Sequence, residues 1–392
     1  MTARYRGLTW DHPRGRVALE QAAATATDAS GDPLIAWDVH PLEGFESTPI
    51  DGLAERYDVI VLDHPHLGDA LEHRAIRPLD EVFDAAFLDA VRADAVGPGA
   101  ASYTLDGRLW ALPLDAATQV AASVPDLVPE APGTWSEVLE LAASSPVGLS
   151  LAGPHALLTF ASLCVALGEE PAVTPERGFV GVEVGAEAFD LLARLAARMP
   201  AGVADLNPIG LLERMRSARD VAYVPLVYGY ATYASGPRAL RFDDAPAARR
   251  GGRRGSTIGG TGIAISSRCR PDAALVDHLM GLLDPETQRT FLPANDGQPG
   301  LRSAWTDAAV DAAAGGFYRR TLATIEDSWV RPRVPGYIPF QANGSAILRD
   351  ALLHGGGGGG AAALAELDRA YDALARSALA RPALAGGRTS HP

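Results

Sequence analysis

Imidazole and carboxylate groups gather at three points in the N-terminal third of the chain. Each set follows an apolar stretch, and together they comprise Asp11 with His12, then His40, then Asp63, His64 and His66. Imidazole titrates near neutral pH and acts as a general acid or base. The same groups bind polar ligands through hydrogen bonds, and some of them ligate metals. The chemistry open to these residues is therefore proton transfer, ligand binding or metal binding.

A metal site is the least favoured of the three. Zinc sites need several converging ligands, and the sequence has no partner motif such as H-E-x-x-H. The two cysteines, Cys164 and Cys269, are far apart and match no metal or redox spacing. We expect no metal and no cofactor, and we expect each cysteine to be a small buried hydrophobe. A disulfide between them stays open.

The three sets of polar residues follow three predicted strands, Tyr5–Trp10, Leu34–His40 and Tyr57–Asp63, with a helix starting at Pro13 after the first. The third strand is a continuous apolar run, which is typical of a parallel strand covered on both faces. This alternation predicts an α/β lobe, and such sheets bind ligands beyond the carboxyl ends of their strands. The alternative is that Asp11 and Asp63 cap helices and the histidines lie on the surface. It is favoured for each residue alone, whereas a cleft is favoured for the three sets together.

A second α/β lobe is predicted over roughly residues 115–250. A hairpin turn at Asp106-Gly107 precedes it, and its own signals include a capping box at Thr134 to Glu137 and a helix from Ala156 to Leu167. Further strands are predicted at Leu109 to Leu114, Val147 to Leu151 and Asp220 to Pro225. The tail from residue 306 to 380 reads as mostly helical, with a break at Trp329 to Tyr337. The glycine run 355–360 reads as a flexible linker before the last helix.

Between these parts lies the glycine-rich stretch Gly255 to Ser266, which ends as an apolar strand. Glycine lets the backbone approach a neighbour or ligand closely. No Gly-Lys-Ser/Thr follows and the chain has no lysine, so this is not a phosphate loop. Nor does the chain carry the glycine fingerprint of a dinucleotide fold. On the glycines alone a tightly packed turn is favoured over the floor or hinge of a cleft.

Composition narrows the functional classes. With 392 residues, of which 47% are hydrophobic, the chain is long enough for two lobes. Its formal charge of −14 argues against binding nucleic acid or anionic membrane surfaces. The first residues lack the apolar core of a signal peptide, and no apolar run reaches 18 residues. As written, the sequence predicts a soluble, cytoplasmic protein, although a removed leader or a misassigned start codon would look the same.

The order of these segments resembles the extracellular solute-binding proteins of family 1, the maltose-binding-like proteins of carbohydrate ABC transporters. The resemblance covers nearly the whole chain and is carried by YDVIVLDHP, YTLDGRLWALPLDAATQV, GTWSEVLELA, DVAYVPLVYGYATYA and the stretch from GSTIGGTGIAIS to DPETQR. It implies a two-lobed type II periplasmic-binding-protein fold with a ligand cleft between lobes. One lobe would comprise residues 1–111 plus 257–300, and the other residues 115–254 plus 302–392.

The resemblance also implies a function. The lobes would close on a small polar ligand, such as a carbohydrate, polyol or organic acid, for uptake through an ABC permease, with a monomeric chain and no covalent chemistry. Carboxylates, amides and arginines bind sugar hydroxyls, and aromatic faces pack on their C–H patches. The implied ligand-binding positions are Trp10, Asp11, His12, His40, Asp63, His64, Asp115, Thr118, Gln119, Tyr228, Gly229, Gly259, Gly260, Trp329 and Arg331. An arginine in the cleft, Arg331 or Arg333, would favour an anionic ligand.

Two departures from the family keep other functions open. No signal peptide is seen, and the strand ends carry more histidine and acid than a plain sugar site. The alternative is therefore a cytoplasmic enzyme recruited from this fold, in which His64, Asp63 or His12 moves protons. The sequence has no nucleophile elbow, Cys-His pair or cofactor fingerprint that would name its reaction. A third hypothesis is a scaffold or sensor that binds a partner protein.

Overall fold

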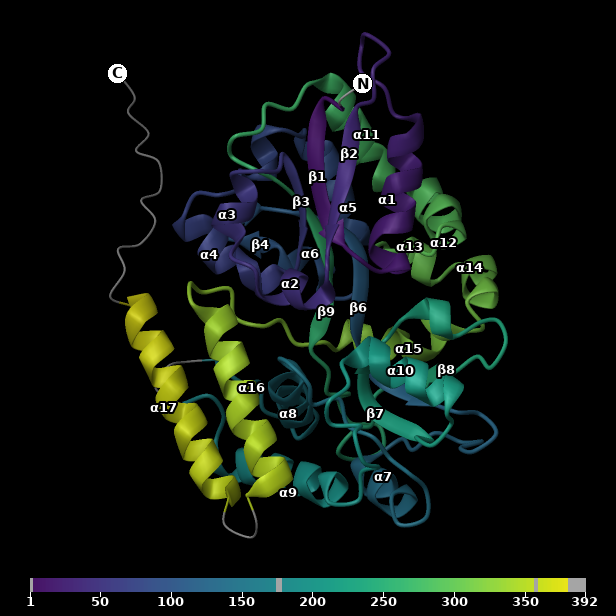
Figure 1. The fold of residues 1–392 in the computed structure, drawn as a ribbon, viewed down its shortest axis with the longest axis vertical. Helices are drawn as coiled ribbons and strands as arrows, with labels where there is room; N and C mark the ends of the chain where they lie inside the picture. Colours follow the sequence, from purple (N-terminus) through teal and green to yellow (C-terminus); the bar gives the residue numbers. More distant parts are fainter. Residues whose placement is uncertain (1–2, 174–177, 356–358, 380–392) are drawn as a thin grey trace.

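Two long antiparallel strands, β6 (Leu112–Ser123) and β9 (Ile258–Ile265), run from one lobe of the molecule into the other (Figure 1). The computed structural model describes residues 3–173, 178–355 and 359–379. All twelve residues of β6 are buried, so its polar members must find partners inside the protein. These two strands therefore set the frame on which both lobes and the region between them are built.

The first lobe has a parallel core that the alternation of strands and helices predicts correctly. Strand β1 (Tyr5–Trp10) lies between β2 (Ile35–His40) and β3 (Val59–Leu62), both parallel to it, and β9 pairs antiparallel with β3. Its helices are α1 (Pro13–Thr25), α2 (Leu42–Ser47), α3 (Ile50–Ala54), α4 (Leu67–Glu72), α5 (Ala85–Asp94), α6 (Gly99–Ser102), α11 (Ala273–Leu282) and α12 (Leu292–Ala294). Short turns of helix, η1 (His64–His66) and η2 (Leu79–Glu81), follow β3 and α4.

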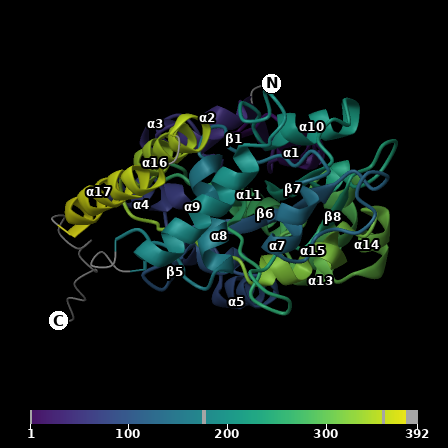
Figure 2. The same ribbon diagram turned by 90° about the horizontal axis from the view of Figure 1, so that it is seen from below.

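The second lobe is built on the other half of β6. There β6 pairs with β7 (Tyr223–Tyr228) and β8 (Arg241–Asp243), which completes the order β2-β1-β3-β9-β6-β7. Helices pack around this end: α7 (Trp135–Leu141), α8 (His155–Ala166), α9 (Val182–Ala196), α10 (Pro208–Ser217), α15 (Phe317–Glu326), α16 (Tyr337–His354) and α17 (Gly359–Leu379). Figure 2 shows α16 and α17 side by side along one flank. The remaining elements are the hairpin β4 (Thr104–Leu105) and β5 (Arg108–Leu109), the short helical turn η4 (Ala231–Tyr233), a π-helical turn (Thr287–Phe291), α13 (Arg302–Trp305) and α14 (Ala308–Ala313).

Local signals in the sequence predict their elements well. Thr134 caps α7, and Glu137 completes the capping box by accepting from the Thr134 backbone. Asp106 and Gly107 both have positive φ, as a tight hairpin turn requires. Residues 356–358 of the predicted linker lie outside the described residues, whereas Gly359 and Gly360 belong to α17.

The prediction of a strand at Val147 to Leu151 is wrong. This segment makes a single bridge, Val147 with Tyr223, and one backbone hydrogen bond from Gly148 to Tyr223. Its apolar side chains are nevertheless buried. The apolar run therefore reflects core packing rather than a sheet ladder, and an apolar run alone does not distinguish the two.

The glycine-rich stretch enters β9 and packs tightly against its neighbours. A Cβ atom on Gly255 would lie 1.9 Å from the carbonyl oxygen of Ser162 in α8. Gly260 has φ +104°, and a Cβ there would lie 2.5 Å from the carbonyl oxygen of Asp115 in β6. Both positions therefore need glycine for close backbone approach. The packed-turn interpretation is therefore correct, and the same stretch forms one of the two strands that run between the lobes.

The two cysteines are free and buried, one in each lobe. Cys164 lies within α8, and Cys269 follows β9 beside β3. Within the described residues no helix is both long and apolar enough to cross a membrane.

Candidate functional site

The ends of several strands meet where the two lobes face each other. Residues after β1 and β3 of the first lobe approach the middle of β6, the end of β7 and the start of α8. The segment before α16 crosses the same seam. A bond from Arg331 to Asp63 and another from the Gly336 amide to Asp69 attach it to the first lobe. We call this region the interlobe seam.

A buried ion pair lies at the centre of the seam. Arg331 Nη2 donates to Asp63 Oδ2 at 2.5 Å, and the two side chains are only 3% and 16% exposed. Arg331 also donates to Gln341 Oε1 and to the carbonyl of Ile258 at the start of β9. Burial alone would raise the pKa of Asp63, but the charge of Arg331 outweighs it and holds this pKa well below its ordinary value. Asp63 is therefore ionised, and its negative charge balances the positive charge of Arg331.

His64 lies next to this pair and is fully buried. Its Nδ1 lies 3.0 Å from Asp63 Oδ1, to which it can donate, whereas Nε2 has no hydrogen-bond partner among the described residues. Burial lowers the pKa of His64 to about 4, and the charge of Arg331 acts in the same direction. The ring is thus neutral at pH 7, and with Nδ1 facing the Asp63 carboxylate it leaves Nε2 unused.

Tyr228 and His155 bring two more unpartnered groups to the seam from the second lobe. Their rings meet edge to face with centroids 5.9 Å apart. The Tyr228 hydroxyl and both nitrogens of His155 are buried without a hydrogen-bond partner in the described structure. His155 Nε2 lies 3.4 Å from Oε1 of Glu46, which comes from α2 of the first lobe. The two lobes therefore face each other here through polar groups.

A pocket of about 570 Å³ lies beside this group. Its walls come from α2, from the turn before α8 and from α16. Glu46 and Gln341 are among its lining residues, and they contact His155 and Arg331 respectively. Buried polar side chains beside a pocket between two lobes are suited to holding a small polar molecule.

A second buried cluster lies deeper along the first lobe. Arg14 holds Asp115 of β6 with two hydrogen bonds of 2.8 and 3.1 Å, and both side chains are 4% exposed. The Arg14 guanidinium lies over the ring of Tyr230 at 5.0 Å. His12 stacks on Trp10 with centroids 5.1 Å apart. This cluster is internally paired and joins α1 to the crossing strand.

Neither a protein-family model nor a curated protein sequence matches the chain. Among solved structures, maltose-bound MalE3 of T. maritima superimposes with a TM-score of 0.78 at 16% identity, covering 95% of this chain and 100% of that one. An ABC transporter solute-binding protein of Agrobacterium radiobacter K84 in complex with ribitol gives 0.77 at 19%, covering 95% and 98%. UgpB of Mycobacterium tuberculosis in complex with glycerophosphocholine gives 0.74 at 14%, covering 97% and 100%.

The chain has the two-lobed type II periplasmic-binding-protein fold. At identities below 20% this similarity concerns the fold, so the role of each side chain must come from its own surroundings.

Within this fold, several of the predicted binding residues have their polar atoms engaged inside the protein. Thr118 shares hydrogen bonds with the hydroxyls of Ser256 and Ser328, which connects β6 to the neighbouring crossings. Gln119 is fully buried and bonds to Ser162 and Thr159 of α8. These bonds leave both side chains as internal braces where the lobes join.

Other predicted positions lie at the border of the seam. Asp11 is about half exposed and pairs with Arg16, while His40 lies at the end of β2 with a buried, unpartnered Nε2. Trp329 packs in the apolar core of the second lobe. The backbones of Gly259 and Gly229 lie close to aromatic rings: a Cβ would reach within 2.6 Å of the Tyr228 ring at the first position and 2.9 Å of the Phe317 ring at the second. Gly260 packs on the backbone of Asp115 as described above.

Three residues of the seam were not singled out from the sequence. Glu46 lies in a short helix with no distinguishing motif, and Arg14 reads as an ordinary first-turn residue after Pro13. His155 opens α8 in a Gly-Pro-His turn, which is a signal of a helix start rather than of a site. Only the long-range contacts reveal their positions.

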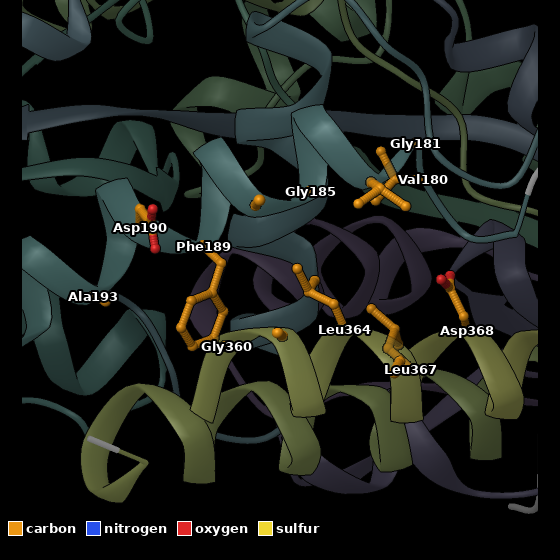
Figure 3. A pocket seen from close by; sticks show the side chains of 14 residues that line it. Val180, Gly181, Gly185, Phe189, Asp190, Ala193, Gly360, Leu364, Leu367 and Asp368 are labelled. Atoms are coloured by element: carbon orange, nitrogen blue, oxygen red, sulfur yellow. The ribbon is translucent and has the colours of Figure 1, made fainter. Parts of the chain in front are cut away.

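A pocket of about 550 Å³ lies within the second lobe, between α9 and α17 (Figure 3). Its walls are mostly glycine, alanine, leucine and phenylalanine side chains, including Phe189, Leu364 and Leu367. The carboxylate of Asp368 at its edge accepts from the Phe179 amide. This apolar pocket lacks the unpartnered polar atoms of the seam. Within the described residues no group of three or more His, Cys, Asp or Glu side chains could hold a metal ion.

The buried neutral histidine gives a testable dependence on pH. Its folded pKa of about 4 lies below the ordinary 6.5, so between these values the unfolded chain binds a proton that the folded chain does not. The neutral ring of His64 therefore does not reduce the stability of the folded protein above pH 6.5, and the folded protein loses stability as the pH falls from 6.5 towards 4. Replacing His64 with glutamine should make the loss of unfolding free energy between pH 7.5 and 4 smaller by on the order of 3 kcal/mol.

The measurement is chemical unfolding followed by circular dichroism across this range. His73→Gln is the matched control, because His73 is exposed and bonds only to a backbone carbonyl of its own helix. Parallel curves for the parent and His64→Gln would show that His64 is not held neutral in the folded protein.

Proposed function

We propose that the protein captures a small polar ligand, a carbohydrate or polyol, at the interlobe seam, and that it closes on this ligand for uptake by an ABC transporter. The observation that carries this proposal is a set of four buried polar atoms that lack a hydrogen-bond partner in the described structure: Nε2 of His64, both nitrogens of His155 and the hydroxyl of Tyr228. Leaving one such group unpaired costs about 1–3 kcal/mol. A ligand rich in hydroxyls supplies donors and acceptors for all of them.

The structural neighbours support this proposal through what they bind. The structures include complexes with maltose, ribitol and D-mannitol, so this fold holds sugars and polyols in several proteins. In this chain the partners of such a ligand would be Tyr228 and His155 from the second lobe and His64 from the first. Closure would bring the two sets together around the ligand.

The crossing strands supply the connection about which the lobes would move. We propose residues 1–111 plus 257–300 and residues 115–254 plus 302–392 as the two bodies, with the chain acting as a monomer that delivers its ligand to a permease. Such a role requires the protein to meet its ligand on the outer side of the membrane that holds the permease.

The sharpest test removes one unpartnered hydroxyl. We expect Tyr228→Phe to weaken ligand binding by about five- to tenfold, which corresponds to the loss of one hydrogen bond of about 1 kcal/mol. The unfolding free energy should stay the same or rise, because the deleted hydroxyl has no partner in the folded protein. Binding is measured by isothermal titration calorimetry, after a thermal-shift screen of sugars and polyols identifies a stabilising ligand.

Tyr223→Phe is the matched control, because its hydroxyl is also buried and unpartnered on the same strand, β7, but lies outside the seam. It should leave the affinity unchanged. Equal losses of affinity in Tyr228→Phe and Tyr223→Phe would show that the ligand does not bind at the Tyr228 hydroxyl. A hit that is chemically converted, with conversion lost in His64→Ala, would replace binding by catalysis, and failure of every sugar and polyol to bind would contradict the proposed function.

A further inference from the structure

The pocket at the mouth of the seam carries an excess of negative charge. Three of its lining residues are carboxylates, Glu43, Glu46 and Asp350, and its lining contains one arginine, Arg349. That arginine pairs with Asp205. The rest of the lining combines apolar residues, Pro154, Ile338, Ala342 and Ala346, with Ser47, Gly153, Gln341 and His354. Carboxylates therefore outnumber arginine in this pocket, and its apolar residues can contact the carbon skeleton of a ligand.

The partners of these three carboxylates in the described structure are an amide and two histidine rings. Within the described residues none of the three forms an ion pair with an arginine. Glu43 accepts from the neutral amide of Asn207 at 3.3 Å, and Asp350 lies beside His354, which is exposed. Behind the pocket, Asp63 and Arg331 neutralise each other. The three carboxylates of the pocket thus have no paired arginine among the described residues, while Arg349 and Arg331 are each paired with an aspartate.

An independent observation points to a ligand at one of these carboxylates. His155 is 1% exposed, and neither of its ring nitrogens has a partner. Its Nε2 faces Oε1 of Glu46 across 3.4 Å. A carboxylate only accepts hydrogen bonds, and a neutral imidazole nitrogen without a proton does the same. An ammonium group has three donors and no acceptor, so a single such group can satisfy both atoms.

We propose that the ligand carries a positively charged nitrogen, as an amino sugar or amino polyol does, and that its ammonium is held by Glu46 beside His155. This inference rests on the proposed function and names the class of its ligand. It reverses the expectation that an arginine in the cleft selects an anion, because the charge of Arg331 is spent on Asp63. Glu46 is then the residue that determines specificity.

The test compares ligands that share a skeleton and differ in charge. The first set is D-glucosamine, D-glucose and D-glucuronate, and the second is 1-amino-1-deoxysorbitol, sorbitol and gluconate. In calorimetry at low salt, the amine should bind about tenfold or more tightly than the neutral member of its set, as expected for one charge-assisted hydrogen bond, and the acid should bind most weakly. The advantage of the amine should shrink in 0.5 M salt.

The variant Glu46→Gln should abolish most of this preference, so that the amine and the neutral member of its set bind about equally, because the neutral amide no longer attracts the ammonium charge. Asp350→Asn offers a second variant in the same pocket, with a smaller expected effect. Glu140→Gln is the matched control, because Glu140 is an exposed carboxylate on α7 outside this pocket. Equal unfolding midpoints for the three variants would exclude damage to the fold.

The outcomes separate this inference from the proposed function. A neutral sugar or polyol that binds as tightly as its amine would overturn the inference and leave the proposed function standing. An amine preference that survives in Glu46→Gln would overturn the assignment to Glu46. If no member of either set binds, the inference fails; the proposed function fails with it only when the wider panel of neutral sugars and polyols also shows no binding.

Discussion

Replacing Arg331 with methionine should lower the free energy of unfolding by about 3–5 kcal/mol, because the change leaves the buried carboxylate of Asp63 without its counter-charge. The substituted side chain keeps much of the length of arginine but cannot donate to Asp63, Gln341 or the carbonyl of Ile258. The measurement is denaturant unfolding at pH 7, followed by circular dichroism. The double variant with Asp63→Asn should recover most of the loss, since it no longer buries an unpaired charge.

The same pair gives a prediction for acid. Arg331 holds the pKa of Asp63 well below its ordinary value of 3.8, so the pair stabilises the folded protein above that value. This stability is lost as the pH falls below about 4, where the unfolded chain takes up a proton that the folded chain resists. The control is Arg108→Met, which removes an exposed pair with Asp80 and should cost at most about 1 kcal/mol. If Arg331→Met lowers the free energy of unfolding as little as Arg108→Met does, water must reach the Asp63 carboxylate and solvate its charge.

The second large effect is expected at Arg14. Its two hydrogen bonds to Asp115 are buried, and its guanidinium lies between the rings of Trp10 and Tyr230. Arg14→Met should therefore also lower the free energy of unfolding by about 3–5 kcal/mol. Because Asp115 lies on the crossing strand β6, ligand affinity should fall as well. Unfolding and calorimetry on the same preparation measure both quantities.

Arg16→Met is the matched control for Arg14. Arg16 lies two residues further along the same helix, and its ion pair with Asp11 is exposed to solvent. A loss for Arg14→Met no larger than that for Arg16→Met would show that the buried pair adds nothing beyond a surface pair.

Much of the fold could be predicted because its signals are local. The strand Tyr5–Trp10, the box at Thr134 and the turn at Asp106 depend on neighbours a few residues away. The predicted strand at Val147 failed because an apolar run records burial and not hydrogen bonding. The two-lobed arrangement came from the order of many segments and not from any single one.

The candidate site was harder to predict because its contacts join distant parts of the chain. Asp115 is 101 residues from Arg14, and Asp63 is 268 residues from Arg331. The sequence showed these residue types but not which of them cancel each other's charge. Taken alone, Arg331 suggests an anionic ligand; because Arg331 is paired with Asp63, Glu46 is among the carboxylates that no arginine balances. The role of His155 could not be predicted for the same reason. Its local sequence indicates only the start of a helix, and only its proximity to Glu46 places it in the candidate site.

The placement of the two cysteines provides each lobe with its own reporter of opening. The thiolate is the reactive form, and burial raises the pKa of Cys269 to about 12 and that of Cys164 well above its ordinary value. Each thiol therefore reacts with an uncharged alkylating reagent only when the structure around it unfolds locally. Cys164 lies in the second lobe and Cys269 in the first. The alkylation rates of the two thiols therefore report local unfolding of each lobe separately. A decrease in one of these rates on adding ligand would then show which lobe the ligand stabilises, without any engineered label.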